Sequence, residues 1–213
     1  MRWIGIAMAG LLVGCGSKGD DAKNAIAAVG AVASGDVQDR VEEAEKFRQD
    51  RIARGDTVAM AYSDLQKYLP ESVAGLEPDG DPSGQSQSMA GFSMSQTERR
   101  WVGPEGPEGS SRPEVKVSIV DFGGSQQGYA MLAAPLLMGF SREDDQEKVG
   151  SVKMDLAHTG GWLELRKDTK NVAFTAVTRY RFVIKVEAEG FGEDKSDLAR
   201  SVAEDVARKL SDK

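Results

Sequence analysis

The sequence is poor in the residue types on which most catalytic and metal sites depend. Its 213 residues include one cysteine and one histidine, and aromatic residues make up 7% of the chain. A single cysteine excludes an intrachain disulfide. Acidic residues outnumber lysine and arginine by 34 to 27. The chain therefore lacks the excess of positive charge with which nonspecific nucleic-acid binders displace counterions from phosphate, so we expect no nucleic-acid partner.

The sequence also lacks an apolar run of the roughly 20 residues that a membrane-spanning helix needs. A shorter run stands at the N-terminus, where the charged residue Arg2 precedes an apolar stretch from Ile4 to Val13, followed by Gly14 and Cys15. This order of a charged start, a short apolar core and a small residue is typical of a secretion signal. We therefore predict a signal peptide over residues 1–14.

The end of this segment, Leu12-Val13-Gly14-Cys15, resembles the lipobox of bacterial lipoproteins. The resemblance implies that the bond before Cys15 is cut and that its thiol carries a lipid, so this thiol is neither a nucleophile nor a metal ligand. Two or more acyl chains, such as palmitate, anchor a protein stably. In this family an Asp after the cysteine commonly retains the protein in the inner membrane of Gram-negative cells. Gly16 in that place implies the periplasmic face of the outer membrane, if the cell has one.

Residues 15–54 are predicted to form a lipidated helical stalk. Its second half is dominated by charge, and acid-before-base pairs four residues apart stabilise an exposed helix. These pairs are Asp36/Arg40, Glu42/Lys46 and Asp50/Arg54. The pattern fits a solvated spacer, or alternatively a coiled-coil or partner-binding helix, although fewer than three clean heptads are present.

Residues 55–213 are predicted to form an α+β domain with an antiparallel sheet of about five or six strands packed by helices. The first helix is capped by Asp56 or Thr57, carries Val58, Tyr62, Leu65 and Leu69 on one face and ends at Pro70. Residues 77–88 are expected to form a loop. Alternating apolar and polar residues then predict strands. Two further helices are expected, one over residues 125–139 and one at the C-terminus, where apolar residues recur every four positions. Strands are expected at 90–101, 115–119, 152–156, 162–166, 172–177 and 180–188, of which the last two are either separate strands, the favoured interpretation, or one long bent strand. The apolar residues of the last helix are Leu198, Val202, Val206 and Leu210.

The element order of this domain is similar to that of Mog1/PsbP-like domains, a fold that some bacterial lipoproteins use. No motif accompanies the similarity. It therefore implies a fold and no activity.

Two acidic segments are candidate cation sites. Asp79, Asp81 and Ser83 stand at alternate positions before Gly84, as in the first half of an EF-hand loop, but the twelfth position is Ala90 where a bidentate Glu belongs. The run from Glu143 to Glu147 fits a solvated acidic loop better than an ion site. We therefore expect no metal and no cofactor.

Four other motifs suggest chemistry only weakly. His158 lies in a predicted turn, near Asp155 or Thr159 as partners for a base, but no serine motif or free thiol accompanies it. Asp121-Phe122-Gly123 copies a kinase tripeptide without the other kinase motifs, and Gly123-Gly124 before a helix is the geometry of an anion site without a following cation. Arg99-Arg100-Trp101 could bind a phosphate or a glycan, or simply end an amphipathic strand. We predict that the protein is not an enzyme.

The sequence thus indicates a lipid-anchored protein of the cell envelope with a binding or accessory role toward another envelope protein. The alternative is a periplasmic carrier or sensor of a small apolar or amphipathic ligand. Its cleft would be lined by Tyr129, Met131 and Met138, because methionine-rich walls adapt to varied shapes.

Overall fold

A computed structural model describes residues 35–89, 92–105, 111–123 and 139–211. All of these residues belong to one compact unit, Ser34–Lys213. The signal peptide, the lipobox and the first part of the predicted stalk lie outside the described residues.

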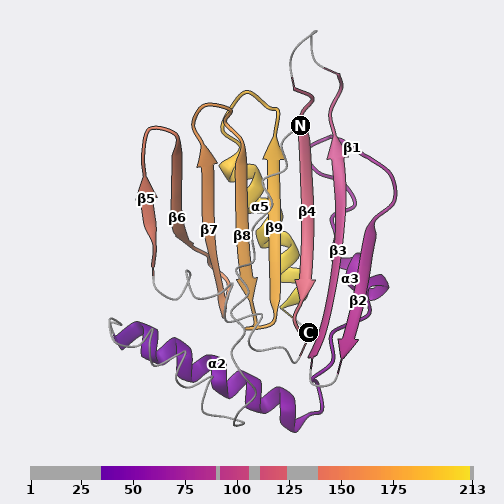
Figure 1. The fold of residues 1–213 in the computed structure, drawn as a ribbon, viewed down its shortest axis with the longest axis vertical. Helices are drawn as coiled ribbons and strands as arrows, with labels where there is room; N and C mark the ends of the chain where they lie inside the picture. Colours follow the sequence, from indigo (N-terminus) through magenta and orange to yellow (C-terminus); the bar gives the residue numbers. More distant parts are fainter. Residues whose placement is uncertain (1–34, 90–91, 106–110, 124–138, 212–213) are drawn as a thin grey trace. The chain divides into compact units, whose positions relative to one another are not determined.

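A single antiparallel sheet forms the body of the described chain (Figure 1). Its strands follow the spatial order β1-β3-β4-β9-β8-β7-β6-β5, and β2 also pairs with β3. The nine strands are β1 (Glu77–Pro78), β2 (Ser83–Met89), β3 (Phe92–Val102), β4 (Glu114–Asp121), β5 (Ser141–Glu143), β6 (Glu147–Lys153), β7 (Thr159–Arg166), β8 (Val172–Thr178) and β9 (Phe182–Glu189).

The α+β class and the antiparallel sheet are confirmed, but the expected five or six strands are too few. β1 and β5 have two and three residues, too few to show a period. β2 was predicted as a loop because its sequence, Ser-Gly-Gln-Ser-Gln-Ser-Met, has no alternation of apolar and polar residues. It is a strand because it pairs with β3 along its whole length, from Ser83 opposite Glu98 to Met89 opposite Phe92.

One face of the sheet carries the main core. Val117 of β4 lies beside Val186 of β9, which lies beside Phe174 of β8, and all three are buried. Helix α5 (Ser196–Leu210) packs against β8 and β9 on this face and is drawn behind them in Figure 1. Each fully buried side chain of this kind contributes about 1.5–3 kcal/mol.

The predicted C-terminal helix is thus present, with its buried stripe displaced from the expected one. Val206 and Leu210 are buried as expected, together with Ala199, Ala203 and Ala207. Leu198 and Val202 are only partly buried at the margin of the core. The small alanines allow the helix to lie close to the sheet, and Asp194 accepts a hydrogen bond from the Ser196 amide at 2.8 Å at its start.

The helix predicted to begin near Asp56 is much shorter than expected. Helix α3 spans Tyr62–Leu65 and a 3-10 turn, η1, spans Gln66–Tyr68. The preceding backbone is instead bonded to the sheet, because the Ala59 amide donates to Ser93 Oγ at 2.8 Å and the Met60 amide donates to Asp121 Oδ2 at 2.7 Å. These bonds replace the first helical turn.

The chain between residues 171 and 189 forms two strands, as expected. The tight turn that joins them is centred on Arg179 and Tyr180, whose φ angles are +53° and +51°. Three residues, 179–181, separate the paired strand ends Thr178 and Phe182. Positive φ angles in such a turn are usually adopted by Gly or Asn. Two L-residues in this conformation cost roughly 1–2 kcal/mol each.

Helix α2 (Gly35–Ala53) lies within the predicted stalk region. None of its side chains that the structure describes is buried, and Ile52 is 45% exposed. The helix is therefore attached to the domain by few contacts, which are described below.

Candidate functional site

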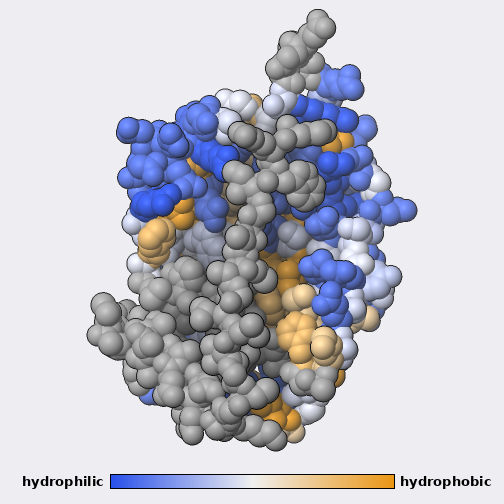
Figure 2. Space-filling view, in the orientation of Figure 1, coloured by the Kyte–Doolittle hydropathy of each residue, from blue (hydrophilic) through white to orange (hydrophobic). Residues whose placement is uncertain are grey.

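The face of the sheet opposite α5 is divided into an apolar part and a polar part. Phe122, Val177 and Val183 form a small buried cluster, against which Met94, Val120, Trp162 and Tyr180 pack. Farther along the same strands the side chains are charged, such as Lys185 and Glu187 on β9. Figure 2 shows hydrophilic residues in the upper part of this view and hydrophobic ones lower down. We call the polar part over β2, β3 and β4 the open face.

Ion pairs cross the strands on the open face. Lys116 Nζ lies 3.2 Å from a Glu98 carboxylate oxygen and 4.0 Å from one of Glu187. Arg100 pairs with Asp79 and lies 3.5 Å from Glu114. Exposed pairs of this kind contribute only about 0–1 kcal/mol to stability. The charges are therefore available for recognition at little cost to the fold.

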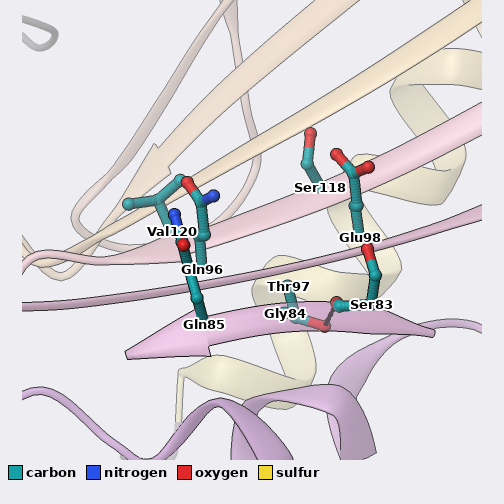
Figure 3. Close-up of a pocket in the computed structure, with 8 residues that line it drawn as sticks. All are labelled: Ser83, Gly84, Gln85, Gln96, Thr97, Glu98, Ser118 and Val120. Atoms are coloured by element: carbon teal, nitrogen blue, oxygen red, sulfur yellow. Dashed lines mark hydrogen bonds between the residues drawn. The ribbon is translucent and has the colours of Figure 1, made fainter. Parts of the chain in front are cut away.

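A shallow depression of about 380 Å³ lies on the open face (Figure 3). Gln85 of β2 and Gln96 of β3 point to the same side as Val120, with Glu98 and Ser118 beside them. The lining residues are Ser83, Gly84, Gln85, Gln96, Thr97, Glu98, Ser118 and Val120. Six of these eight residues are polar, so the depression suits hydrogen bonds rather than an apolar ligand.

Local packing positions the floor of this depression. Thr97 Oγ1 donates to the Ser83 carbonyl oxygen at 2.8 Å, which ties β2 to β3. Gly84 allows a close approach, because a Cβ there would lie 2.8 Å from the Gln96 carbonyl oxygen and 2.9 Å from Tyr62 Cδ2. Any larger residue at this position would push β2 away from β3 and from the Tyr62 side chain.

A second depression of about 420 Å³ adjoins the first. It carries four acidic and three basic side chains, so its charge is mixed with a small acidic excess. Its lining residues are Asp79, Asp81, Ser83, Glu98, Arg99, Arg100, Glu114 and Lys116. This composition suits a polar protein segment better than a free anion.

The structure argues against phosphate or glycan binding by Arg99-Arg100-Trp101. Trp101 is fully buried and cannot stack on a ligand. Arg100 is engaged by Asp79 and Glu114, while Arg99 lies over the Trp101 ring at 5.6 Å. The simpler interpretation, the end of an amphipathic strand, fits these contacts.

The acidic segments weighed as cation sites are engaged within the protein. Asp79 pairs with Arg100. In the β5–β6 hairpin, Asp144 Oδ1 accepts the Gln146 and Glu147 amides at 2.9 and 2.8 Å, and these bonds lower the pKa of Asp144. Over the residues that the structure describes, no three His, Cys, Asp or Glu side chains are grouped as a metal site.

Asp121 of the kinase-like tripeptide serves the fold. It is fully buried and accepts hydrogen bonds from Nε and Nη2 of Arg181, both at 2.7 Å. The amides of Met60 and Gly123 supply two more, at 2.7 and 2.8 Å. The Gly123 amide is therefore already used, which removes it from the anion site considered for Gly123-Gly124; Gly124 lies outside the described residues.

The network continues to the end of α2. Arg181 Nη1 donates to both Asp56 oxygens at 2.9 and 3.0 Å, and Arg51 of α2 donates to Asp56 at 3.2 Å. Arg51 also donates to the Gly123 carbonyl oxygen at 2.7 Å. Burial acts to raise the pKa of Asp56, but the charges of Arg181 and Arg51 outweigh it and lower that pKa. A continuous ionic network thus ties the C-terminal end of α2 to the sheet.

His158 lies in a second contact between α2 and the sheet, which we call the α2 clasp: Glu43, Phe47, His158, Arg179 and Tyr180. His158 Nδ1 lies 2.7 Å from Glu43 Oε1, and the Tyr180 hydroxyl donates to Glu43 Oε2 at 2.6 Å. The Phe47 ring packs 4.6 Å from the imidazole and 5.5 Å from the Tyr180 ring. Arg179 lies over Phe47 at 5.7 Å.

The partner of His158 is thus neither of the residues expected from the sequence. Thr159 Oγ1 donates to the Ala157 carbonyl oxygen and bonds to Thr178, and no contact joins Asp155 to the imidazole among the described residues. Glu43 is 115 residues away in sequence, and only the packing of α2 brings it near. The lone aromatic residue Phe47 on an otherwise charged helix was the signal that could have located this contact.

Backbone strain gathers at the α2 clasp. His158, Arg179 and Tyr180 have φ angles of +55°, +53° and +51°. Such strain persists only where surrounding contacts compensate it, and here the contacts are those to α2. The clasp orients an imidazole with a carboxylate, but the contacts described supply no nucleophile beside them.

The site residues predicted from the sequence lie outside the described residues. These are Leu12, Val13, Gly14 and Cys15 of the lipobox and Tyr129, Met131 and Met138 of the predicted cleft. They remain predictions from the sequence.

Comparison with protein-family models, with curated proteins and with solved structures finds no match to this chain. None of the helices in the described ranges has both the length and the apolar character needed to cross a bilayer.

Proposed function

We propose that this protein is a lipid-anchored protein of the bacterial cell envelope whose sheet domain binds another envelope protein. The anchor rests on Leu12-Val13-Gly14-Cys15, where the only thiol of the chain follows a short apolar run. Acyl chains on Cys15 would hold the mature protein at the membrane, at the periplasmic face of the outer membrane in a Gram-negative cell.

The observation that carries the binding role is the character of the open face. Its two depressions are shallow and are lined by serine, glutamine and charged side chains of both signs. Small-molecule sites are concave and mostly apolar. The face instead suits an extended polar segment of a protein, and the acidic excess of the second depression favours a segment with net positive charge.

The stalk proposed over residues 15–54 is supported by α2. A helix of 19 residues is about 28 Å long at 1.5 Å per residue. It stands between the proposed anchor and the domain in the sequence. The α2 clasp and the Asp56 network would then hold the last part of this segment against the domain.

The function proposed is binding rather than catalysis. His158 is two-thirds covered, and its contact with Glu43 joins two elements of the protein. Residues of this kind position an attached helix. We therefore assign the α2 clasp a structural role in presenting the domain.

The anchor is tested by intact mass and membrane fractionation of the native protein beside Cys15→Ser. We expect a mass that matches cleavage before Cys15 plus acyl chains, and loss of both the lipid mass and membrane association in the variant. An unacylated, soluble wild type would overturn the anchor.

The binding role is tested separately, by placing a photo-crosslinking residue at Gln96 on the open face or at Asp168 in the β7–β8 turn. We expect one discrete adduct from Gln96 and none from Asp168. Glu98→Lys should abolish the adduct because it reverses charge on the open face, whereas Glu143→Lys, the same change on β5, should preserve it. An adduct indifferent to Glu98→Lys would overturn the binding face.

A further inference from the structure

Among the residues that the structure describes, the sheet has one edge that is open. β2 pairs with β3 on one side, and all seven of its residues are exposed. An edge strand of this kind presents a row of unpaired backbone amide and carbonyl groups, which is a template for another strand. The exposure is large even for the apolar residue of the strand, since Met89 is 76% exposed.

The other terminal strands of the sheet carry the usual protections. β5 has only three residues, two of them charged, and Arg142 is paired with Glu147. β1 has two residues, and one of them is Pro78. Short length, charge and proline all discourage pairing at an edge. β2 has none of these within its seven residues, so its free side is the exception in this sheet.

The sequence of β2 is nearly symmetric about Ser86. Gln85 and Gln87 flank it, Gly84 and Ser88 come next, and Ser83 and Met89 end the strand. In an antiparallel pair centred on Ser86, each glutamine would lie opposite a glutamine of the other strand, and no like charges would meet. A symmetric, uncharged strand is complementary to itself, which is what a two-fold interface requires.

We propose that β2 pairs antiparallel with β2 of a second copy of this chain, in the register that places Ser86 opposite Ser86. The two sheets then join into one. Each copy uses its single open edge in this contact. No open edge is left for a third copy, so the assembly is a dimer.

The side of β2 that faces α3 is compatible with this pairing. Tyr62 packs over Gly84, and its amide donates to Ser86 Oγ at 3.0 Å. In the proposed register the residue opposite Gly84 is Ser88 of the second copy. A small side chain there leaves room for the half-exposed Tyr62 ring.

The pairing also bears on the open face. Gln85 lines the first depression from β2. In the dimer the depressions of the two copies would lie on either side of the two-fold axis, with the glutamines of both β2 strands between them. The inference does not depend on the lipid anchor or on a second protein, although anchoring in a membrane would raise the local concentration of copies.

The test uses the full chain with Cys15→Ser, so that one introduced cysteine is the only thiol. Ser86→Cys, on the proposed axis, should give a disulfide-linked dimer under mild oxidation, because residues directly opposite in an antiparallel pair lie about 4.5–5.5 Å apart at Cα. Ser141→Cys, at the protected edge strand β5, is the matched control and should stay monomeric.

Charge substitutions in the same background test the register. Gln85→Lys with Gln87→Lys places like charges opposite each other and should abolish the disulfide of Ser86→Cys. Gln85→Lys with Gln87→Glu places opposite charges in both pairs and should preserve it. Circular dichroism of each variant verifies that the sheet is folded.

Several results would overturn the proposal. These are a Ser86→Cys variant that forms no more dimer than Ser141→Cys, a disulfide to a different protein, or charge variants that behave alike. The Cys15→Ser background makes the result independent of acylation, and the Gln96 adduct tests the other partner, so failure here is distinct from failure of the proposed function.

Discussion

Helices α2 and α5 are attached to the same sheet by opposite means. α5 buries Val206, Leu210 and three alanines against the strands. α2 buries none of its described side chains, and is held by the carboxylate of Glu43, the Phe47 ring and the Arg51 guanidinium. One helix is part of the core and the other is an attachment.

The two helices should therefore detach from the sheet under different conditions. Apolar burial is proportional to area and tolerates small shifts. The contacts of α2 depend on hydrogen-bond geometry and on charge, so a single group or a change of pH can weaken them. We expect α5 to be lost only with the whole fold and α2 to open locally.

The largest loss of stability should follow from breaking the buried ion pair between Asp121 and Arg181. Asp121→Ala leaves the Arg181 guanidinium buried without its main partner, and breaking a buried pair in this way costs about 3–5 kcal/mol. Urea unfolding followed by circular dichroism measures the loss. Asp145→Ala, an exposed residue, is the control and should change the free energy of unfolding by less than about 0.5 kcal/mol. Equal effects would show that Asp121 is not essential to the fold.

Shortening a buried side chain of α5 should lower the free energy of unfolding by nearly as much. Leu210 is fully buried, and Leu210→Ala should lower the free energy of unfolding by about 2–5 kcal/mol. Lys209→Ala, next to it, removes only an exposed pair with Asp205 and should cost about 0–1 kcal/mol. If the two variants unfold at the same urea concentration, α5 is not part of the core.

Acid should weaken the attachment of α2 before it affects α5. The pKa of Asp56 lies below its ordinary value, because the Arg181 and Arg51 charges outweigh the opposing effect of burial. Its stabilising contribution is therefore complete above the unfolded pKa, about 3.9, and is lost as pH falls through the folded pKa.

Urea midpoints measured from pH 6 down to pH 2 follow this loss. Asp56→Asn should remove part of the dependence on pH below about 4, where Asp56 titrates. Asp168→Asn, an exposed control, should leave it intact. A wild-type slope retained in Asp56→Asn would contradict the role of Asp56.

The smallest loss of stability should follow from removing one hydrogen bond of the α2 clasp. Tyr180→Phe removes the hydroxyl that donates to Glu43 and should cost about 1 kcal/mol. Hydrogen exchange should quicken in α2 and stay unchanged in α5. Tyr68→Phe removes a hydroxyl elsewhere and should alter neither helix. Faster exchange in both helices after Tyr180→Phe would mean that α2 is part of the cooperative core.

The accuracy of the sequence predictions follows the same division between apolar and polar contacts. β4, β8, β9 and α5 were predicted because their apolar residues recur with a period of two or near four. β2 was missed because a strand of Ser, Gly and Gln has no such period. The helix expected from Asp56 was shortened because Ala59 and Met60 bond to the sheet.

The sequence by itself determined the α+β class, the alternating faces of the central strands and the C-terminal helix, because burial of apolar residues leaves a periodic pattern along the chain. Tertiary structure alone decided that Asp121 meets Arg181, that His158 meets Glu43 and that β2 ends the sheet with an open edge. These contacts join residues far apart in the chain through one or two polar groups each, and a hydrogen bond, unlike an apolar stripe, leaves no period in a sequence to be read.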